Sequence, residues 1–181
     1  TGIIDGFEKR KAKTKEAAQQ AFVALLNERS YDDITIREIA ERAGIGFKTF
    51  YRHYSDKIEL TQDITRGFVD QVYENFEPMQ TLEGSLKNLR RVLEVVAENA
   101  ATVRAIGRSP ERDTLVAPVT EQAAVAALEM QPETQSVSGS DKLRRSLITH
   151  HFAHTQLIFF FWWVENDMAI PIDEMAEMIA R

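Results

Sequence analysis

The segment 47–54 combines cationic and hydroxyl side chains with aromatic residues at helical spacing. Phe50 and Tyr54 are four residues apart, so both can face a core on one side of a short helix. Their placement turns Lys48, Thr49, Tyr51, Arg52 and His53 partly or wholly outward. Arginine and lysine can reach guanine O6 and N7, and threonine can offer thymine a hydrogen bond or a methyl contact. The segment is therefore typical of a helix that reads the major groove of DNA.

Two further elements would have to hold that helix in place. The preceding segment opens with Thr35 and Glu38 at the spacing of a capping box, which starts a helix. Gly44 then predicts a break, because glycine adopts the positive φ that ends a helix. A third helix should follow, capped by Ser55 and running to about Phe76. Two short helices with a glycine turn form a helix-turn-helix. The apolar stripe expected on the first of them is Ile36, Ile39, Ala40 and Ala43.

Residues 14–60 also resemble the N-terminal domain of the tetracycline-repressor-type (TetR/AcrR) transcriptional regulators. The matching patterns are T-x-x-[ED]-[IL]-A at 35–40, A-G-[VI] at 43–45, T-[FL]-Y-x-[HY]-[FY] at 49–54 and x-x-K-x-x-L at 55–60. The resemblance implies a bacterial regulator that binds a palindromic operator as a homodimer. It further implies a repressor that a small-molecule effector releases from DNA. Beyond this stretch only chain length and helical pattern agree with the family.

The expected DNA contacts combine residue chemistry with this resemblance. Tyr51 and His53 match family positions that touch phosphates, and Lys57 would add charge at the positive end of its helix. For Phe47, pressing on a thymine methyl and packing against the chain are equal alternatives. The full set is Thr35, Arg37, Gly46, Phe47, Lys48, Thr49, Tyr51, Arg52, His53 and Lys57.

The charge distribution is consistent with a DNA-binding end. The whole chain carries a net charge of −6, but residues 1–57 hold 11 Lys/Arg against 9 Asp/Glu, a net of +2. Residues 58–181 hold 11 Lys/Arg against 19 Asp/Glu, a net charge of −8. Phosphate binding requires a local basic surface and not a basic protein.

The remaining sequence predicts an all-α fold with about nine helices and no strand. Helices are expected over Leu82 to about Ala100, Ala101–Ile106, Leu115 to Met130, Leu143 to about Met168, and from Pro171 onward. Pro118 predicts that the helix within Leu115 to Met130 starts near this proline. Residues 131–140 are expected to form a polar loop. The predicted domains are 1–57, a helix-turn-helix domain with its core in 14–57, and 58–181, a helical effector-binding and dimerisation domain.

Residues 143–181 are expected to form the homodimer interface, as the resemblance implies. Leu143, Leu147, His150, His154, Leu157, Phe161 and Val164 should share one face of the long helix, and Ile148, Phe152, Phe159 and Trp163 another. A helix that is apolar on two faces must be covered on both. The resemblance also implies an effector pocket, although aromatic residues at this spacing more often form core. The candidate pocket residues are Tyr73, Phe76, Arg104, His151, Phe152, Gln156, Phe159 and Trp163.

Other classes of function fit the sequence less well. There is no cysteine, so disulfides and thiolate metal sites are excluded, and His150 and His154 alone are a weak metal pair. No phosphate loop or nucleophile elbow occurs, so we expect neither an enzyme nor a cofactor. No signal peptide opens the chain and no apolar run has the length of a membrane span, which predicts a cytoplasmic, nucleoid-associated protein. The open alternative is a DNA-organising dimer that binds another protein and no effector.

Overall fold

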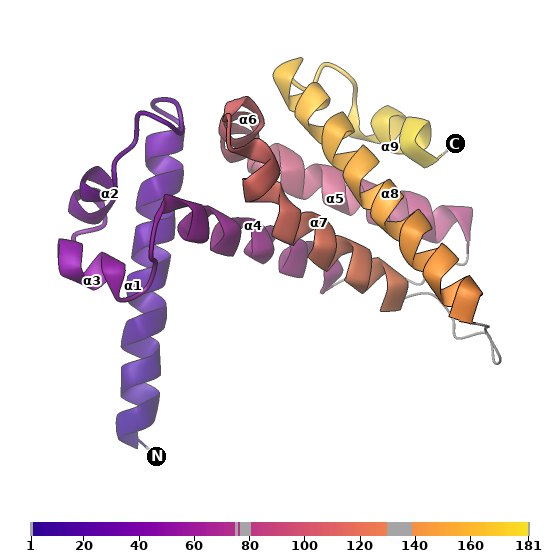
Figure 1. Cartoon of the computed structure of the whole chain (residues 1–181). Coiled ribbons are helices and arrows are strands. Elements are labelled where there is room, and N and C mark those ends of the chain that lie inside the picture. Colours follow the sequence, from indigo (N-terminus) through magenta and orange to yellow (C-terminus); the bar gives the residue numbers. More distant parts are fainter. Residues whose placement is uncertain (1, 75, 77–80, 130–138, 181) are drawn as a thin grey trace.

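The computed structural model describes residues 2–74, 76, 81–129 and 139–180, and all its regular elements are helices (Figure 1). This confirms the all-α prediction of about nine helices. None of these helices is both long and apolar enough to cross a bilayer. The described helices are α1 (Gly2–Leu26), α2 (Ile36–Arg42), α3 (Phe47–Tyr51), α4 (Lys57–Tyr73), α5 (Leu82–Glu98), α6 (Ala100–Arg108), α7 (Arg112–Glu129), α8 (Gly139–Glu165) and α9 (Ile172–Ala180).

The helices α1 to α3 form a head at one end of the molecule, and the N-terminal half of α1 projects beyond α3 (Figure 1). The Thr35–Glu38 capping box starts α2 as expected. Gly44 has a φ of +64°, so the turn between α2 and α3 needs glycine. Phe50 on α3 and Tyr54, three residues beyond its end, are buried, which anchors α3 against the core.

The core of this head extends into the other helices. Its centre is built from Phe22, Ile39 and Phe50, and it continues through Leu60 and Ile64 on α4. The residues Ile106 of α6 and Leu115 of α7 belong to the same buried cluster. The first half of α4 is therefore packed as part of the head, although it continues into the larger helical body.

The start and the end of α4 differ from the sequence-based prediction. The N-cap is Asp56, whose carboxylate accepts a hydrogen bond from the Glu59 backbone at 2.8 Å. The predicted cap, Ser55, instead donates from its own backbone N–H and hydroxyl to the Glu59 carboxylate. Both residues are good caps, and only the backbone path selects between them. The helix ends at Tyr73 and not at Phe76.

The prediction that α7 starts near Pro118 is wrong. This helix begins at Arg112, so Pro118 lies inside it. Ser109 supports the start, since its hydroxyl accepts a hydrogen bond from the Glu111 backbone at 3.1 Å. A proline within a helix supplies no N–H for the carbonyl four residues earlier, here that of Thr114. The Gln62 side-chain amide on α4 donates to this carbonyl at 3.2 Å.

The second core lies where α5, α8 and α9 meet. Leu93, Phe160, Trp163 and Met175 are buried in it. The link from α8 to α9 contains two consecutive non-glycine residues with positive φ, Asp167 at 52° and Met168 at 53°. The Trp163 indole N–H donates to the Ile170 carbonyl at 2.8 Å and secures this link.

The predicted limits and faces of α8 also need correction. It runs from Gly139 to Glu165 in place of the predicted Leu143 to Met168, and most of the predicted 131–140 loop lies outside the described residues. Leu143 and Leu147 are exposed, whereas Val164, expected on the same face, is buried. Over 27 residues, a stripe at alternating three- and four-residue spacing drifts around a straight helix of 3.6 residues per turn.

Candidate nucleic-acid interface and internal cavity

The outer surface of α3 presents the side chains that the sequence predicted. Lys48 and Arg52 are exposed and Thr49 is half-buried. The Phe47 ring meets the Tyr51 ring edge-to-face, with 5.0 Å between the ring centroids. Phe47 nevertheless remains 48% exposed and Tyr51 47% exposed. Phe47 thus packs against the chain and still presents an apolar edge to a partner. Gly46 precedes α3 as its N-cap and is also exposed.

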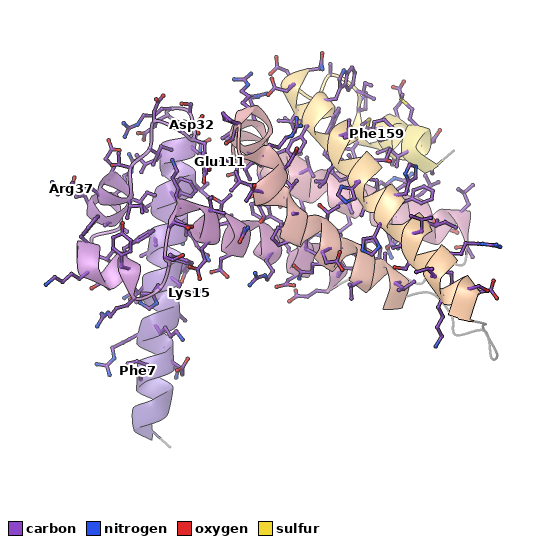
Figure 2. All side chains as sticks on the ribbon, viewed as in Figure 1. Phe7, Lys15, Asp32, Arg37, Glu111 and Phe159 are labelled. Atoms are coloured by element: carbon purple, nitrogen blue, oxygen red, sulfur yellow. The ribbon has the colours of Figure 1, made fainter. Side chains whose placement is uncertain are left out.

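Thr35 and Arg37, both among the expected DNA contacts, differ in whether their side chains are free to bind DNA. The Thr35 hydroxyl donates to the Glu38 carboxylate at 2.8 Å and accepts from the Glu38 backbone at 3.3 Å, so it is occupied by the helix cap. The backbone hydrogen bond from Thr35, with further bonds from its hydroxyl and from Arg29, lowers the pKa of Glu38 to about 2. Arg37 is exposed and extends away from the head (Figure 2), where it can reach a phosphate.

Lys57 has a different role from the predicted phosphate contact. Its ammonium group donates to the backbone carbonyls of Tyr31 at 2.6 Å and of Ile34 at 2.9 Å. It also lies 4.2 Å from the centroid of the Tyr31 ring. Burial lowers the pKa of Lys57, as expected for a cation that packs against the loop between α1 and α2. Lys57 therefore fastens this loop to α4 and does not extend into solvent.

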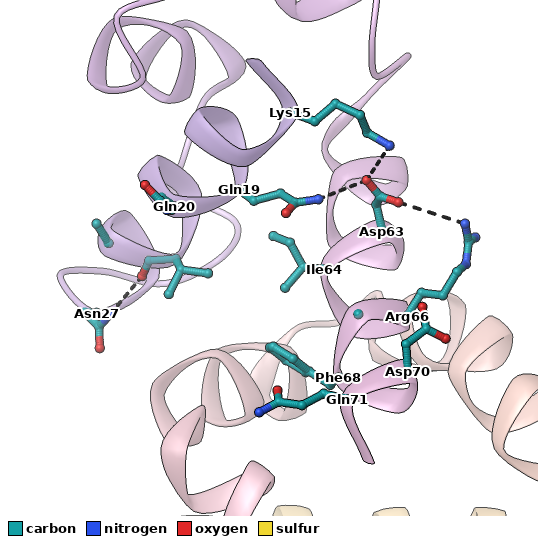
Figure 3. A pocket seen from close by; sticks show the side chains of 13 residues that line it. Lys15, Gln19, Gln20, Asn27, Asp63, Ile64, Arg66, Phe68, Asp70 and Gln71 are labelled. Carbon is teal, nitrogen blue, oxygen red and sulfur yellow. Dashed lines mark hydrogen bonds and ion pairs between the residues drawn. The ribbon is translucent and has the colours of Figure 1, made fainter. Parts of the chain in front are cut away.

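A network around Asp63 on α4 ties that helix to α1 (Figure 3) and also holds Tyr54, three residues beyond the end of α3. The Asp63 carboxylate accepts hydrogen bonds from the Tyr54 phenol at 2.8 Å and from the Gln19 amide at 2.9 Å. The Lys15 ammonium lies 2.8 Å from the same carboxylate. Burial by itself would raise the pKa of Asp63, but these donors outweigh it and hold the pKa below its usual value. Sequence reasoning missed this network because its members are far apart in the chain.

The surroundings of His53 are strongly positive. Its Nδ1 is buried and makes no hydrogen bond with the described residues. Burial lowers the pKa of His53, and Arg52, Lys11 and Lys15 lower it further. The same cations that disfavour a charged imidazole favour a phosphate beside it. α1 thus adds positive charge next to α3.

A cavity of about 580 Å³ lies between α4, α5, α7 and α8. Among the candidate pocket residues, Tyr73, Phe76, Phe152 and Gln156 line it. The Tyr73 phenol donates to the Ala123 carbonyl across the cavity wall at 2.9 Å. The volume lies within the range of small-molecule sites in proteins.

The other four candidates do not line this cavity. Arg104 donates to the Val164 carbonyl at 2.6 Å and to the Asp167 carboxylate at 2.9 Å, which holds α6 against the end of α8. Trp163 belongs to the second core, and Phe159 is exposed (Figure 2). His151 is exposed as well. The composition of α8 could not separate its candidate side chains, because only the rotation of this helix decides which of them face the cavity.

The two histidines four residues apart on α8 have separate surroundings. His150 makes hydrogen bonds to the Ser146 carbonyl at 2.7 Å and to the Glu121 carboxylate at 2.9 Å. These partners raise the pKa of His150, the Ser146 carbonyl most strongly. His154 is exposed. Within the described part of the chain, no group of three or more His, Cys, Asp or Glu could hold a metal ion.

An apolar stripe runs along the outer side of α8. Leu143, Leu147, Ile158 and Trp162 are 74%, 71%, 67% and 52% exposed. On α9, Met178 is also exposed. Exposed apolar side chains gathered along one helix are unusual for a monomer surface and mark a site of association.

Comparison with known proteins agrees with this architecture. Residues 20–64 match the model of the family described as bacterial regulatory proteins, tetR family. An uncharacterized HTH-type transcriptional regulator, YxbF of Bacillus subtilis, is 32% identical over 91 residues, 49% of this chain and 24% of that protein. The HTH-type transcriptional repressor KstR2 of Mycobacterium tuberculosis is 30% identical over 69 residues, 34% of each chain.

A solved structure extends the likeness to nearly the whole fold. A TetR-family transcriptional regulator from Syntrophomonas wolfei superimposes with a TM-score of 0.72 at 20% identity, over 93% of this chain and 92% of that one. The sequence matches, by contrast, span about a quarter to a third of the curated relatives, 24% and 34% of their lengths. Residues 20–64 therefore match the N-terminal domain of the tetR family of bacterial regulatory proteins, and nearly the whole chain shares its fold with a solved structure described as a TetR-family regulator.

Proposed function

We propose that the protein is a sequence-specific DNA-binding transcriptional regulator that acts as a homodimer. The observation that carries this proposal is the two-sided character of α3. Its inner side is fixed by the buried Phe50 and, three residues beyond its end, by the buried Tyr54, while Lys48 and the C-cap residue Arg52 are exposed on the outer side. A rigid helix with cationic and hydroxyl groups outward can enter a major groove without rearrangement.

The proposed contacts divide by chemistry. Lys48, Thr49 and Arg52 would read base edges, and Phe47 would cover a thymine methyl. The phosphate contacts would come from Gly46 and Arg37, near the starts of α3 and α2, and from Tyr51 and His53, at and just beyond the end of α3. Thr35 is left out, because its backbone N–H and its hydroxyl both donate to the Glu38 carboxylate. Lys57 is left out, because its ammonium group already binds two backbone carbonyls. Phosphate contacts position the head and base contacts give it sequence preference.

The exposed stripe on α8 supports the proposal that a second copy of this chain covers it, through residues 143–181. An isologous dimer pairs the same surface on both subunits, and the aliphatic side chains of this stripe would pack on their equivalents. Two heads related by such a two-fold axis would meet half-sites about 34–36 Å apart on a palindromic operator.

The cavity favours an effector-responsive regulator over the DNA-organising alternative, which requires no internal space. α4 connects the two sites directly, since Leu60 and Ile64 lie in the core of the head and Val69 and Val72 line the cavity. A ligand that fits one orientation of α4 better than another would shift the spacing of the two heads. We propose that the effector releases the protein from its operator, so that 1–57 binds DNA and 58–181 senses and dimerises.

The test is selection of bound DNA from a random duplex pool by the purified full chain at near-physiological salt. A palindrome with two defined half-sites is the expected result. Recovery of unselected DNA, with binding that falls steeply as salt rises, would contradict base reading and support the DNA-organising alternative.

A further inference from the structure

The wall of the cavity between α4, α5, α7 and α8 is uncharged. Among the described residues, the side chains that line it include no Asp, Glu, Lys, Arg or His. A ligand carboxylate, phosphate or ammonium group placed there would lose its water without gaining a counter-charge. The lining therefore selects against ions.

Most of the polar groups in this wall are already engaged. The hydroxyls of Thr65, Thr120 and Thr149 donate to the carbonyls of their own helices at 3.0, 2.7 and 2.9 Å. Tyr73 donates to the Ala123 carbonyl. Of the polar side chains that line the cavity, the Ser85 hydroxyl and the Gln156 amide make no hydrogen bond with another described residue.

The Gln156 amide occupies a distinctive position. On α8 it lies one turn from Phe152 and one turn from Phe160, and all three line the cavity. It thus provides a donor and an acceptor between two aromatic rings. Leu82, Ile148 and Phe152 line the cavity and are also exposed, so the cavity opens to the outside beside apolar side chains.

We propose that this cavity binds an uncharged, largely apolar molecule whose single hydrogen-bonding group, a hydroxyl or carbonyl, pairs with the Gln156 amide. This inference rests on the effector site proposed above and names the chemistry of its ligand. A long-chain alcohol or ester fits this wall: the chain lies among the valines and phenylalanines, and the neutral head group meets Gln156. The corresponding carboxylate has the same chain but brings a charge that nothing in the wall compensates.

The test compares 1-dodecanol with dodecanoate at pH 8, below the concentration at which either aggregates. Binding to the full-length protein is measured by displacement of the uncharged fluorescent probe N-phenyl-1-naphthylamine. Dodecanol is expected to bind at least about tenfold more tightly than dodecanoate. Equal or tighter binding of dodecanoate, or binding of neither compound, would overturn the inference.

Two variants locate the binding site. Gln156→Leu should weaken dodecanol binding about threefold to tenfold by removing one hydrogen bond, whereas Gln20→Leu, which removes an amide from α1 outside the cavity, should have no effect. Ala153→Trp, which fills the cavity, should abolish binding. If folded Ala153→Trp binds dodecanol as the unmodified protein does, the assignment to this cavity is wrong.

Retention of the selected operator is measured in the same samples. Tight dodecanol binding without DNA release would support the ligand chemistry and contradict effector release. If the protein selects no operator, the proposed regulator role fails, and the order of dodecanol and dodecanoate binding still decides the inference.

Discussion

The side-chain amide of Gln62 donates to the carbonyl of Thr114 at 3.2 Å, which is the carbonyl that Pro118 cannot satisfy within α7. This bond joins α4, the helix that connects the head to the cavity, to α7 at the point where the proline interrupts the backbone ladder. It explains how a helix can continue through a residue that normally stops one.

A double-mutant cycle tests this explanation. Gln62→Leu should lower the free energy of unfolding by about 1 kcal/mol, because the Thr114 carbonyl loses its donor. In a Pro118→Ala background the same change should cost much less, since the backbone N–H of residue 118 can then serve Thr114. Urea denaturation measures both. Equal costs in the two backgrounds would show that Gln62 does not substitute for the missing N–H.

Lys57→Met should destabilise the head by about 1–3 kcal/mol, because two backbone carbonyls lose a charged donor. The comparison is Lys48→Met on α3, whose side chain is exposed and which should change stability by less than about 0.5 kcal/mol. Lys48→Met should instead weaken DNA binding. A Lys57→Met protein of normal stability that bound all DNA more weakly would restore the phosphate contact first predicted for this residue.

Asp63→Asn should destabilise the protein at pH 7 by about 1–3 kcal/mol, because the amide cannot replace a carboxylate that accepts from Lys15, Tyr54 and Gln19. The pKa of Asp63 is lowered in the folded state, so its stabilisation is present above the ordinary aspartate pKa of about 4. It is lost as the pH falls toward the folded value. Urea titrations between pH 7 and pH 3 should show a smaller decline in the variant. The exposed Asp32→Asn serves as the control and should follow the unmodified protein.

Arg52→Ala should relax sequence preference at one position of each half-site and weaken operator binding by about 1–3 kcal/mol. Repeating the DNA selection with the variant measures the preference, and fluorescence anisotropy measures the affinity. Arg91→Ala on α5, far along the chain from α3, should alter neither. An Arg52→Ala protein that kept its preference and lost affinity equally for all sequences would reassign this residue to phosphate contact.

Leu147→Asp should convert the proposed dimer to a monomer at micromolar concentration, because the charge would be buried against its two-fold mate. Light scattering after size-exclusion chromatography gives the mass directly. Val125→Asp places the same charge on an exposed aliphatic position of α7 and should leave the mass unchanged. If Leu147→Asp kept the dimeric mass of the unmodified protein, α8 would not form the interface.

Local signals in the sequence were enough to identify the head. The Thr35–Glu38 capping box, Gly44 with its positive φ, and the spacing of Phe50 and Tyr54 each act within a few residues. Short-range hydrogen bonding and sterics determine such features. For the same reason the all-α class and the outward side of α3 could be predicted without coordinates.

The tertiary structure decided everything that depends on distant partners. Lys57 turned inward because the Tyr31 and Ile34 carbonyls lie within its reach, and α7 passed through Pro118 because Gln62 on another helix is close enough to help. Among the candidate pocket residues, the rotation of α8 placed Gln156 at the cavity and Trp163 in the core. Periodicity shows that a helix has an apolar face, but a long helix has several, and only packing against its neighbours assigns each one.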